Sequence, residues 1–143
     1  MMAYSHVGHD CRVGDDVIIT INTTVGGHVE IGNKAVLGGS VAVHQFCRIG
    51  QYAMVAGFIA VRKDVLPYCM IAGQPARHYR LNSVGLRRAG ITGERYRALE
   101  QAYREVRSGN KTLQGIAESD EVVQLREWLA VKSRRGLSGF LRE

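Results

Sequence analysis

The sequence predicts a mainly β fold, a parallel β-helix that is followed by a C-terminal α-helical region. Two features predict the β-helix: an aliphatic residue recurs at every sixth position, and the next position is usually glycine. Neither an α-helix nor an ordinary strand has a period of six, so the pattern is typical of a solenoid of hexapeptide repeats. The aliphatic positions are Met1, Val7, Val13, Ile19, Val25, Ile31, Leu37, Val43, Ile49, Val55 and Val61.

Each hexad is expected to form one short strand and one corner, with the aliphatic side chain toward the axis and the glycine accommodating the turn. Three corners close a triangle, so one coil takes eighteen residues, and residues eighteen apart should stack at about 4.8 Å. Residues 1–66 then form nearly four coils. An antiparallel sandwich fits poorly, because it would show strict alternation and more widely spaced turns.

The repeat ends near Leu66, because Pro67 stands at a position that should be aliphatic. Beyond an exit segment, apolar residues recur three and four positions apart, which is the spacing of one face of an amphipathic helix. We therefore expect a hexapeptide-repeat β-helix over residues 1–73 and a helical domain over residues 74–143.

The helical region is expected to contain three helices. The first begins after an N-cap at Thr92 and stops at Ser108. A short second helix covers residues 112–118, and a third runs from 121 to about 135, where Gly136 ends it. The positions predicted to be apolar contacts are Tyr96, Leu99, Tyr103 and Val106 in the first helix and Val122, Leu125 and Leu129 in the third.

The first coil predicts that the chain is truncated at its N-terminus. Met1 already lies in the repeat register, and no capping segment precedes it. Solenoids carry polar caps because an open terminal coil exposes an apolar cross-section and unpaired strand edges. We expect the chain to be the C-terminal part of a longer solenoid.

Basic residues are concentrated in the second half of the chain. Residues 1–73 hold five basic and five acidic side chains, whereas residues 74–143 hold fourteen basic and eight acidic. This excess favours an acidic partner, and nucleic acid, an anionic membrane or an acidic carrier protein would each qualify. A solvated helical surface would give the same composition.

The cysteines indicate a reducing compartment. Their number is odd, and Cys11 and Cys47 would stack two coils apart, beyond the reach of a disulfide. The sequence shows no signal peptide and no apolar run long enough to form a transmembrane segment. We expect a soluble, cytoplasmic protein.

The histidines are gathered by the eighteen-residue period. Four of the five fall within the predicted β-helix, and His6 lies just before the corner that holds the others. One histidine taken alone is most simply a hydrogen-bonded surface residue, but a cluster favours a site. The corner presents, on three consecutive coils, His9 with Asp10, Gly27 with His28, and His44 with Gln45.

These residues suit acyl transfer to an alcohol. The imidazole of His9 can take a proton from a hydroxyl, and the Asp10 carboxylate can orient the ring and stabilise the imidazolium. The backbone N–H of Gly27, one coil away and without a side chain in the way, can donate to an oxyanion. Such a reaction needs no covalent enzyme intermediate.

Metal binding is the main chemical alternative, because neutral imidazoles are good zinc ligands. His6 and His9 have a ligand-like spacing, but no cysteine pair or carboxylate cluster is expected to complete a site within one chain. We therefore expect no metal. The sequence also lacks a phosphate-binding loop and a dinucleotide fingerprint.

Three short motifs carry a family resemblance. Residues 6–11 read His-Val-Gly-His-Asp-Cys, residues 26–28 read Gly-Gly-His, and residues 43–47 read Val-His-Gln-Phe-Cys. With the segment from 73 to 88, they resemble the successive signatures of UDP-N-acetylglucosamine O-acyltransferases over essentially the whole chain. Ala89 departs from the family, which often has a second basic residue there, and the family's N-terminal coils have no counterpart.

The resemblance implies a left-handed parallel β-helix and a homotrimer with active sites in clefts between subunits. It implies transfer of a 3-hydroxyacyl chain from acyl carrier protein to the 3-hydroxyl of UDP-N-acetylglucosamine, the first step of lipid A biosynthesis. No cofactor is implied beyond the phosphopantetheine arm of the carrier protein, and no nucleic acid. The basic helices would meet the acidic carrier protein.

Residue roles follow from the same resemblance. His9 is implied as the general base, Asp10 as its support and Gly27 as the oxyanion donor. Gly57 matches a position where a glycine leaves room for a long acyl chain. The residues implied to line the substrate sites are His6, His28, His44, Gln45, Asn82 and Arg88.

Two alternatives to this function stay open. One is the related N-acyltransferase that acts later in the same pathway, although His-Gln-Phe at residues 44–46 argues against it. The other is a trimeric solenoid that binds or supports a partner without turnover.

Overall fold

The computed structural model describes residues 1–141 and divides into two compact units. The solenoid unit comprises Met1–Asn82 together with the segment that begins at Ser133, and the helical unit comprises Ser83–Lys132. The boundary lies after Asn82, later than the expected division between residues 73 and 74, because strands continue beyond Gly73 and a C-terminal segment returns to the solenoid.

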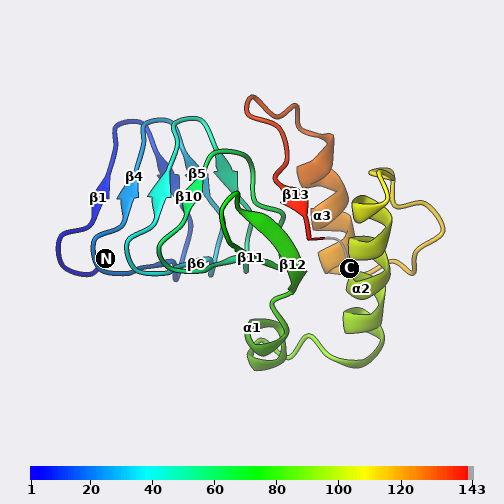
Figure 1. The fold of residues 1–143 in the computed structure, drawn as a ribbon. Coiled ribbons are helices and arrows are strands. Elements are labelled where there is room, and N and C mark those ends of the chain that lie inside the picture. Colours follow the sequence, from blue (N-terminus) through cyan, green and yellow to red (C-terminus); the bar gives the residue numbers. More distant parts are fainter. Residues whose placement is uncertain (142–143) are drawn as a thin grey trace. The chain divides into compact units, whose positions relative to one another are not determined.

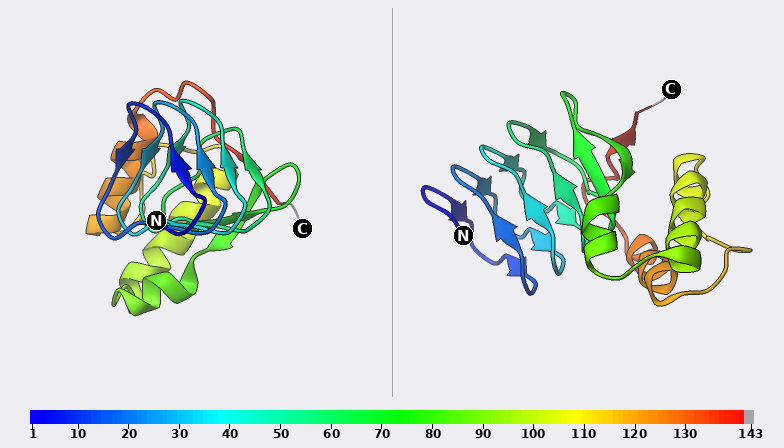
Figure 2. Two further views of the ribbon diagram at one scale, coloured as in Figure 1. Left: turned by 90° about the vertical axis from the view of Figure 1, so that its left-hand side faces the viewer. Right: turned by 90° about the horizontal axis from the view of Figure 1, so that it is seen from below.

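The solenoid consists of short strands that wind around three sides, as Figures 1 and 2 show. Partners lie eighteen residues apart, as in Val7 opposite Val25 and Ile31 opposite Ile49, and they run parallel. The predicted coil length is therefore confirmed. The repeat strands are β1 His6–Val7, β2 Arg12–Val13, β3 Ile18–Ile19, β4 Thr24–Val25, β5 Glu30–Ile31, β6 Val36–Leu37, β7 Ala42–Val43, β8 Arg48–Ile49, β9 Met54–Val55 and β10 Ala60–Val61.

Three sheets form the sides of the prism. Strands β1, β4, β7 and β10 make one side, β2, β5 and β8 make the second, and β3, β6 and β9 belong to the third. The inward residue of most strands is fully buried, and these side chains form one continuous core with the small residues at the corners. The burial of a stacked aliphatic column is the main stabilising contribution in this unit.

The hexad glycines act through close packing between coils and not through the turn conformation that the sequence analysis expected. The left-handed residue of each corner is a different one, such as Asp10 with φ 58° or Phe46 with φ 65°. A Cβ built on Gly32 would lie 2.4 Å from the backbone nitrogen of Gln51 on the next coil. Glycine is needed there because any side chain would push the coils apart.

The last coil is two residues shorter than the others. Val65 bridges to Ile49 and Ile71 pairs with Val55, each sixteen residues away instead of eighteen. The core column therefore continues past Pro67, slightly beyond the end expected near Leu66. Strand β11 Cys69–Ala72 then turns into β12 Arg77–Leu81, which runs antiparallel to it, and β13 Gly139–Phe140 pairs with β12.

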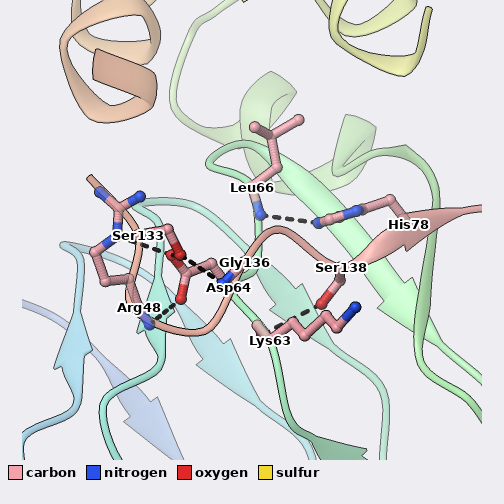
Figure 3. Close-up of polar contacts among 8 residues, drawn as sticks. All are labelled: Arg48, Lys63, Asp64, Leu66, His78, Ser133, Gly136 and Ser138. Carbon is pink, nitrogen blue, oxygen red and sulfur yellow. Dashed lines mark hydrogen bonds and ion pairs between the residues drawn. The ribbon is translucent and has the colours of Figure 1, made fainter. Parts of the chain in front are cut away.

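Asp64 anchors the returning C-terminal segment to the solenoid (Figure 3). Its buried carboxylate accepts hydrogen bonds from the Arg48 backbone N–H at 2.9 Å, from Arg48 Nε at 3.0 Å and from Ser133 Oγ at 2.6 Å. Its backbone N–H donates to Gly136 O, and its carbonyl accepts from Ser138 N–H. A buried carboxylate so fully paired stabilises the segment that contacts it.

His78 is the second buried polar anchor. Its Nε2 accepts a hydrogen bond from the Leu66 backbone N–H at 2.8 Å (Figure 3), and its Nδ1 lies 3.1 Å from Gly139 O. Burial lowers the pKa of this imidazole to about 4, so the ring is neutral near pH 7 with its proton on Nδ1. His78 thus joins β12 both to β13 and to the start of the exit segment.

The helical unit contains α1 Ser83–Arg88, α2 Gly93–Arg107 and α3 Asp120–Ala130. The predicted first helix corresponds to α2, with Thr92 as its N-cap and Leu99, Tyr103 and Val106 buried. Helix α3 is shorter than predicted because Val131 is extended and ends it before residue 135. Its N-cap Ser119 accepts a hydrogen bond from Val122 N–H.

The helix predicted over residues 112–118 is wrong. Leu113 and Gly115 have positive φ values of 54° and 79°, which no α-helix accommodates. The segment packs Leu113 inward as a loop, and the Arg126 guanidinium donates to the carbonyls of Thr112 and Leu113. No helix within residues 1–141 has the length and apolar character needed to cross a bilayer.

Candidate active site

The predicted stacking of polar residues at one corner is confirmed. Two consecutive coils are joined where His28 N–H donates to His9 O at 3.0 Å, and the next pair is joined where Phe46 N–H donates to Gly27 O at 3.0 Å. His9, Gly27 and Gln45 therefore form one column along the corner. A second column beside it contains Asp10, His28 and Phe46.

The contact between His9 and Asp10 fixes the form of the imidazole. His9 Nδ1 lies 3.0 Å from Asp10 Oδ2, and both side chains are exposed. The hydrogen bond from His9, with the nearby His28, lowers the pKa of the Asp10 carboxyl, so that group is an anion that accepts a hydrogen bond from Nδ1–H. The lone pair of the neutral ring is then on Nε2, which is free to act as a base.

Gly27 lies directly against that nitrogen. A Cβ built on Gly27 would be 2.8 Å from both Nε2 and Cε1 of His9, closer than real side chains approach. Within residues 1–141, the Gly27 backbone N–H has no hydrogen-bond acceptor. A proton acceptor and a bare amide donor therefore lie side by side, which is the pair that attack on a thioester requires.

His28 stands on the other side of the same carboxylate. Its Nε2 is 3.8 Å from Asp10 Oδ2, and its ring meets the His9 ring edge to face with centroids 5.0 Å apart. The opposite face of His28 stacks on Phe46 at 4.8 Å, and the Arg134 guanidinium covers Phe46 at 3.9 Å from the ring centroid. The ring of His28 is thus held in place from two sides.

Phe46 and Arg134 were not among the predicted site residues. Phe46 follows His28 by eighteen residues, so the repeat contained the signal that the two rings stack. Arg134 belongs to the segment that returns from the far end of the chain, and no repeat predicts its approach.

The other predicted site residues of the solenoid that carry an imidazole or a side-chain amide near His9 are His6, His44 and Gln45. His6 is exposed in β1, opposite Thr24 of β4, on the side of the prism that leads into the corner. His44 is exposed one coil beyond Gly26, with its backbone N–H donating to Val61 O and its Nδ1 3.3 Å from Gln45 O. They extend the polar surface in both directions from His9.

Three predicted residues lie elsewhere in the chain. Gly57 is at the corner that follows the third sheet, where it lies against Gly39 and not against any histidine. Asn82 is mostly buried at the end of β12, and its amide donates to Tyr52 O at 2.9 Å. Arg88 is exposed at the end of α1, in the helical unit. The single chain does not bring Gly57 or Asn82 to the His9 corner.

The corner also contains a possible set of metal ligands, contrary to the expectation that one chain would not complete one. Donor atoms of His9, Asp10 and His28 all lie within 4.8 Å of one another. Two imidazoles and a carboxylate are ordinary zinc ligands. A metal there would occupy the side chains that the sequence analysis expects to act as the base and its support, so the two interpretations compete for the same groups.

Comparison with known proteins identifies the family. The model of UDP-N-acetylglucosamine O-acyltransferase domain 2 matches residues 64–138. The chain belongs to the UDP-N-acetylglucosamine O-acyltransferase family.

Curated relatives in this family are similar over most of the chain. The acyl-[acyl-carrier-protein]–UDP-N-acetylglucosamine O-acyltransferase of Alkalilimnicola ehrlichii is 44% identical over 118 residues, which are 82% of this chain and 46% of the relative. The enzyme of the same name from Thiobacillus denitrificans is 41% identical over 145 residues, covering 96% of this chain and 56% of the relative. The chain thus spans about half the length of these acyltransferases.

Solved structures of the family match the fold. UDP-N-acetylglucosamine acyltransferase from Campylobacter jejuni superposes with a TM-score of 0.85 at 31% identity, over 96% of this chain and 56% of that one. The Francisella novicida UDP-N-acetylglucosamine acyltransferase gives a TM-score of 0.84 at 32% identity, over 97% and 54%. The β-solenoid followed by helices is therefore the acyltransferase fold of this family.

Proposed function

We propose that this chain carries the catalytic part of an acyltransferase that moves a 3-hydroxyacyl group from acyl carrier protein to the 3-hydroxyl of UDP-N-acetylglucosamine. The observation that supports it most strongly is the placement of His9 Nε2 against Gly27, with Asp10 on the other ring nitrogen. A base beside an unpaired amide donor is suited to attack on a thioester. The family relationship supplies the identity of the two substrates.

The proposed transfer is direct, without a covalent enzyme intermediate. His9 Nε2 takes the proton of the sugar hydroxyl while that oxygen attacks the thioester carbonyl carbon. The Gly27 N–H donates to the resulting oxyanion, and the Asp10 carboxylate stabilises the imidazolium. Collapse of the intermediate forms the ester and breaks the C–S bond, and the leaving thiolate takes the proton back from His9. No oxidant, metal or resident cofactor takes part; the phosphopantetheine arm arrives with the carrier protein.

A homotrimer is part of the proposal. Gly57 and Asn82 lie at corners other than that of His9, so they can reach a His9 site only from a neighbouring copy. A three-sided prism offers such a cleft between each pair of copies. In this arrangement His6, His28, His44, Gln45 and Arg88 contact the substrates, and Gly57 leaves room for the acyl chain.

The carrier protein is proposed to dock through charge, and the basic surface is wider than the helices alone. The helical unit holds nine basic and seven acidic residues, whereas the solenoid unit holds ten and six. Part of the attraction for an acidic carrier therefore comes from the solenoid. Raising the salt concentration should weaken carrier binding, and an affinity independent of salt would argue against this docking.

A cytoplasmic location is proposed for the same protein. The thiols of Cys11, Cys47 and Cys69 are free, which suits a reducing compartment. The two proposed substrates, acyl carrier protein and a nucleotide sugar, would be met in the same compartment.

The test is turnover with both substrates. The chain, alone and fused to the N-terminal half of the Thiobacillus denitrificans relative, is incubated with 3-hydroxyacyl carrier protein and UDP-N-acetylglucosamine, and products are identified by mass spectrometry. We expect an ester at the 3-hydroxyl, lost in His9→Ala. The matched control is Asp15→Ala, an exposed residue at the same hexad position in the next corner. Activity that persists in His9→Ala would remove His9 as the base.

The same assay separates the alternatives. Acylation of an amino sugar instead of a hydroxyl would make the chain an N-acyltransferase, and binding without product in both forms would make it a non-catalytic module. Treatment with a chelator should leave the rate unchanged. A rate abolished by the chelator and restored by zinc would show that the His9, Asp10 and His28 cluster works through a metal.

A further inference from the structure

A cleft with a basic lining opens at the end of the solenoid, along the corner that also holds His9 but beyond His44 and Gln45. Its volume is about 260 Å³, and it lies between the segment after β10, the β11–β12 turn and β13. Arg62 and Lys63 line one side, Arg77 and Gln74 another, and Ser138 belongs to the returning segment. All of these residues are in the solenoid unit.

The positive charges in this cleft are not neutralised by the protein. Among the residues that the structure describes, no acidic side chain lines the cleft, and Arg62, Lys63 and Arg77 take part in no ion pair. Asp64 follows Lys63 directly, but its carboxylate is buried and bound to Arg48 and Ser133. Like charges gathered in a concave site without a counter-charge raise the local potential for anions.

The backbone around the cleft is fixed, although the basic side chains are exposed. Ser138 is buried, and its Oγ donates to Lys63 O at 3.2 Å, which Figure 3 shows beside the Lys63 side chain. Arg135 Nε lies 3.4 Å from Arg62 O, and β13 pairs with β12 at Arg77. Three cations from two nearby segments, residues 62–63 and Arg77, are therefore held around one space by a backbone that is hydrogen-bonded to the returning C-terminal segment.

The chemistry of the lining fits a phosphate group. A guanidinium offers parallel N–H donors that match two phosphate oxygens, and an ammonium adds a point charge. Ala60, Pro75 and Ala76 supply an apolar wall, which suits an organic phosphate better than a hydrated inorganic salt ion. We propose that the cleft of Arg62, Lys63 and Arg77 is a binding site for a phosphate ester.

The cleft lies on the same edge of the prism as His9. Ala60 and Val61 pair with Ala42 and Val43, so Arg62 and Lys63 occupy the coil after His44 and Gln45. Three coils separate Lys63 from His9, roughly 14 Å at the usual strand spacing. The phosphate can come from a nucleoside diphosphate or from a phosphopantetheine arm, and binding itself does not depend on the proposed acyl transfer.

The test is a titration followed by NMR on ¹⁵N-labelled chain at constant ionic strength set with chloride. Inorganic phosphate, UDP and pantetheine 4′-phosphate are added separately. We expect saturable shifts at Lys63, the Arg77 side chain and Ser138 with at least one organic phosphate, and tighter binding of UDP or of pantetheine 4′-phosphate identifies the source. Shifts that map elsewhere, or that chloride reproduces, would overturn the site.

Variants make the result specific. Arg77→Gln and Lys63→Gln should each weaken phosphate binding by about tenfold, since each removes one charge-assisted contact. Arg80→Gln is the matched control, because Arg80 is an exposed arginine of the same strand that does not line the cleft. Thermal unfolding verifies that all three fold. Equal affinity in Arg77→Gln, Lys63→Gln and Arg80→Gln would exclude the cleft as the binding site, whether or not the chain transfers acyl groups.

Discussion

Asp10 Oδ2 lies 3.0 Å from Nδ1 of His9, and this contact determines which nitrogen of the imidazole is available as a base. Because the carboxylate accepts a hydrogen bond from Nδ1–H, the lone pair is on Nε2, the atom that faces Gly27. The arrangement comes from two consecutive residues at one corner. Asp10 has a positive φ of 58°, and the left-handed turn brings its side chain back toward the ring of His9.

The first prediction concerns this contact. In Asp10→Asn, the amide can either accept a hydrogen bond from Nδ1–H or donate one to Nδ1. In a fraction of the molecules the lone pair of the His9 ring is then on Nδ1 and not on Nε2. We expect kcat for acyl transfer to fall by about 10²–10⁴-fold while KM for both substrates changes little. Steady-state kinetics of the active form checks this. A rise in KM with kcat unchanged would make Asp10 a substrate contact instead.

The second prediction concerns Gly27. In Gly27→Ala the new Cβ would lie 2.8 Å from His9 Nε2, so the imidazole must move away from the amide donor. We expect a loss of about 10²–10³-fold in kcat, the usual effect of disturbing an oxyanion site, with little change in the melting temperature because the ring is exposed.

Gly39→Ala provides the control for that substitution. Gly39 occupies the same hexad position on another corner, but its new Cβ would meet nothing nearer than 3.6 Å. Transfer of a short 3-hydroxyacyl chain should persist in this variant; a short chain is used because Gly39 lies against Gly57. If both alanine variants lost activity equally, the effect would be due to the backbone of the repeat and not to the contact with His9.

The eighteen-residue period predicted most of the solenoid and the centre of the candidate site. Val7 and Val25 pair as the arithmetic requires, and the same step brings Gly27 to His9. The period succeeds because a solenoid converts a fixed sequence separation into a fixed spatial neighbour.

Contacts that do not follow the period could not be predicted in this way. Ser133 bonds to Asp64 across 69 positions, and Arg134 reaches Phe46, through a segment that sequence pattern placed in a helix. The role of the hexad glycines also depends on contacts between coils. A Cβ placed on Gly32 would lie 2.4 Å from the next coil, so this position requires glycine. A local turn pattern does not reveal such a contact between coils.

The third prediction concerns thiol reactivity. Burial, with the nearby Asp64 carboxylate, raises the pKa of the Cys47 thiol to about 11, and burial raises the pKa of Cys69 well above its usual value. Cys11 is only partly buried. Since the thiolate is the reactive species, a disulfide reagent at pH 8 should modify one thiol rapidly in the folded protein and all three in denaturant. Cys11→Ser should remove the rapid phase; a rapid phase that survives would assign it to another cysteine.

The last prediction is a loss of stability in acid that originates at His78. Its folded-state pKa is lowered to about 4, mainly because the ring is buried, whereas in the unfolded chain the imidazole titrates near its ordinary value of about 6.5. Between these two values the unfolded state binds a proton that the folded state does not. Stability therefore falls as pH decreases from about 6.5 to 4, by up to roughly 3 kcal/mol.

Urea unfolding at a series of pH values measures this slope. In His78→Gln the amide can still accept from Leu66 N–H and donate to Gly139 O, the two contacts that join β12 to the exit segment and β13, but it does not titrate. We expect a lower stability at pH 7 and a flatter pH dependence than in the wild type. If wild type and His78→Gln lost stability with the same slope below pH 6.5, the acid sensitivity would originate outside the β12–β13 anchor.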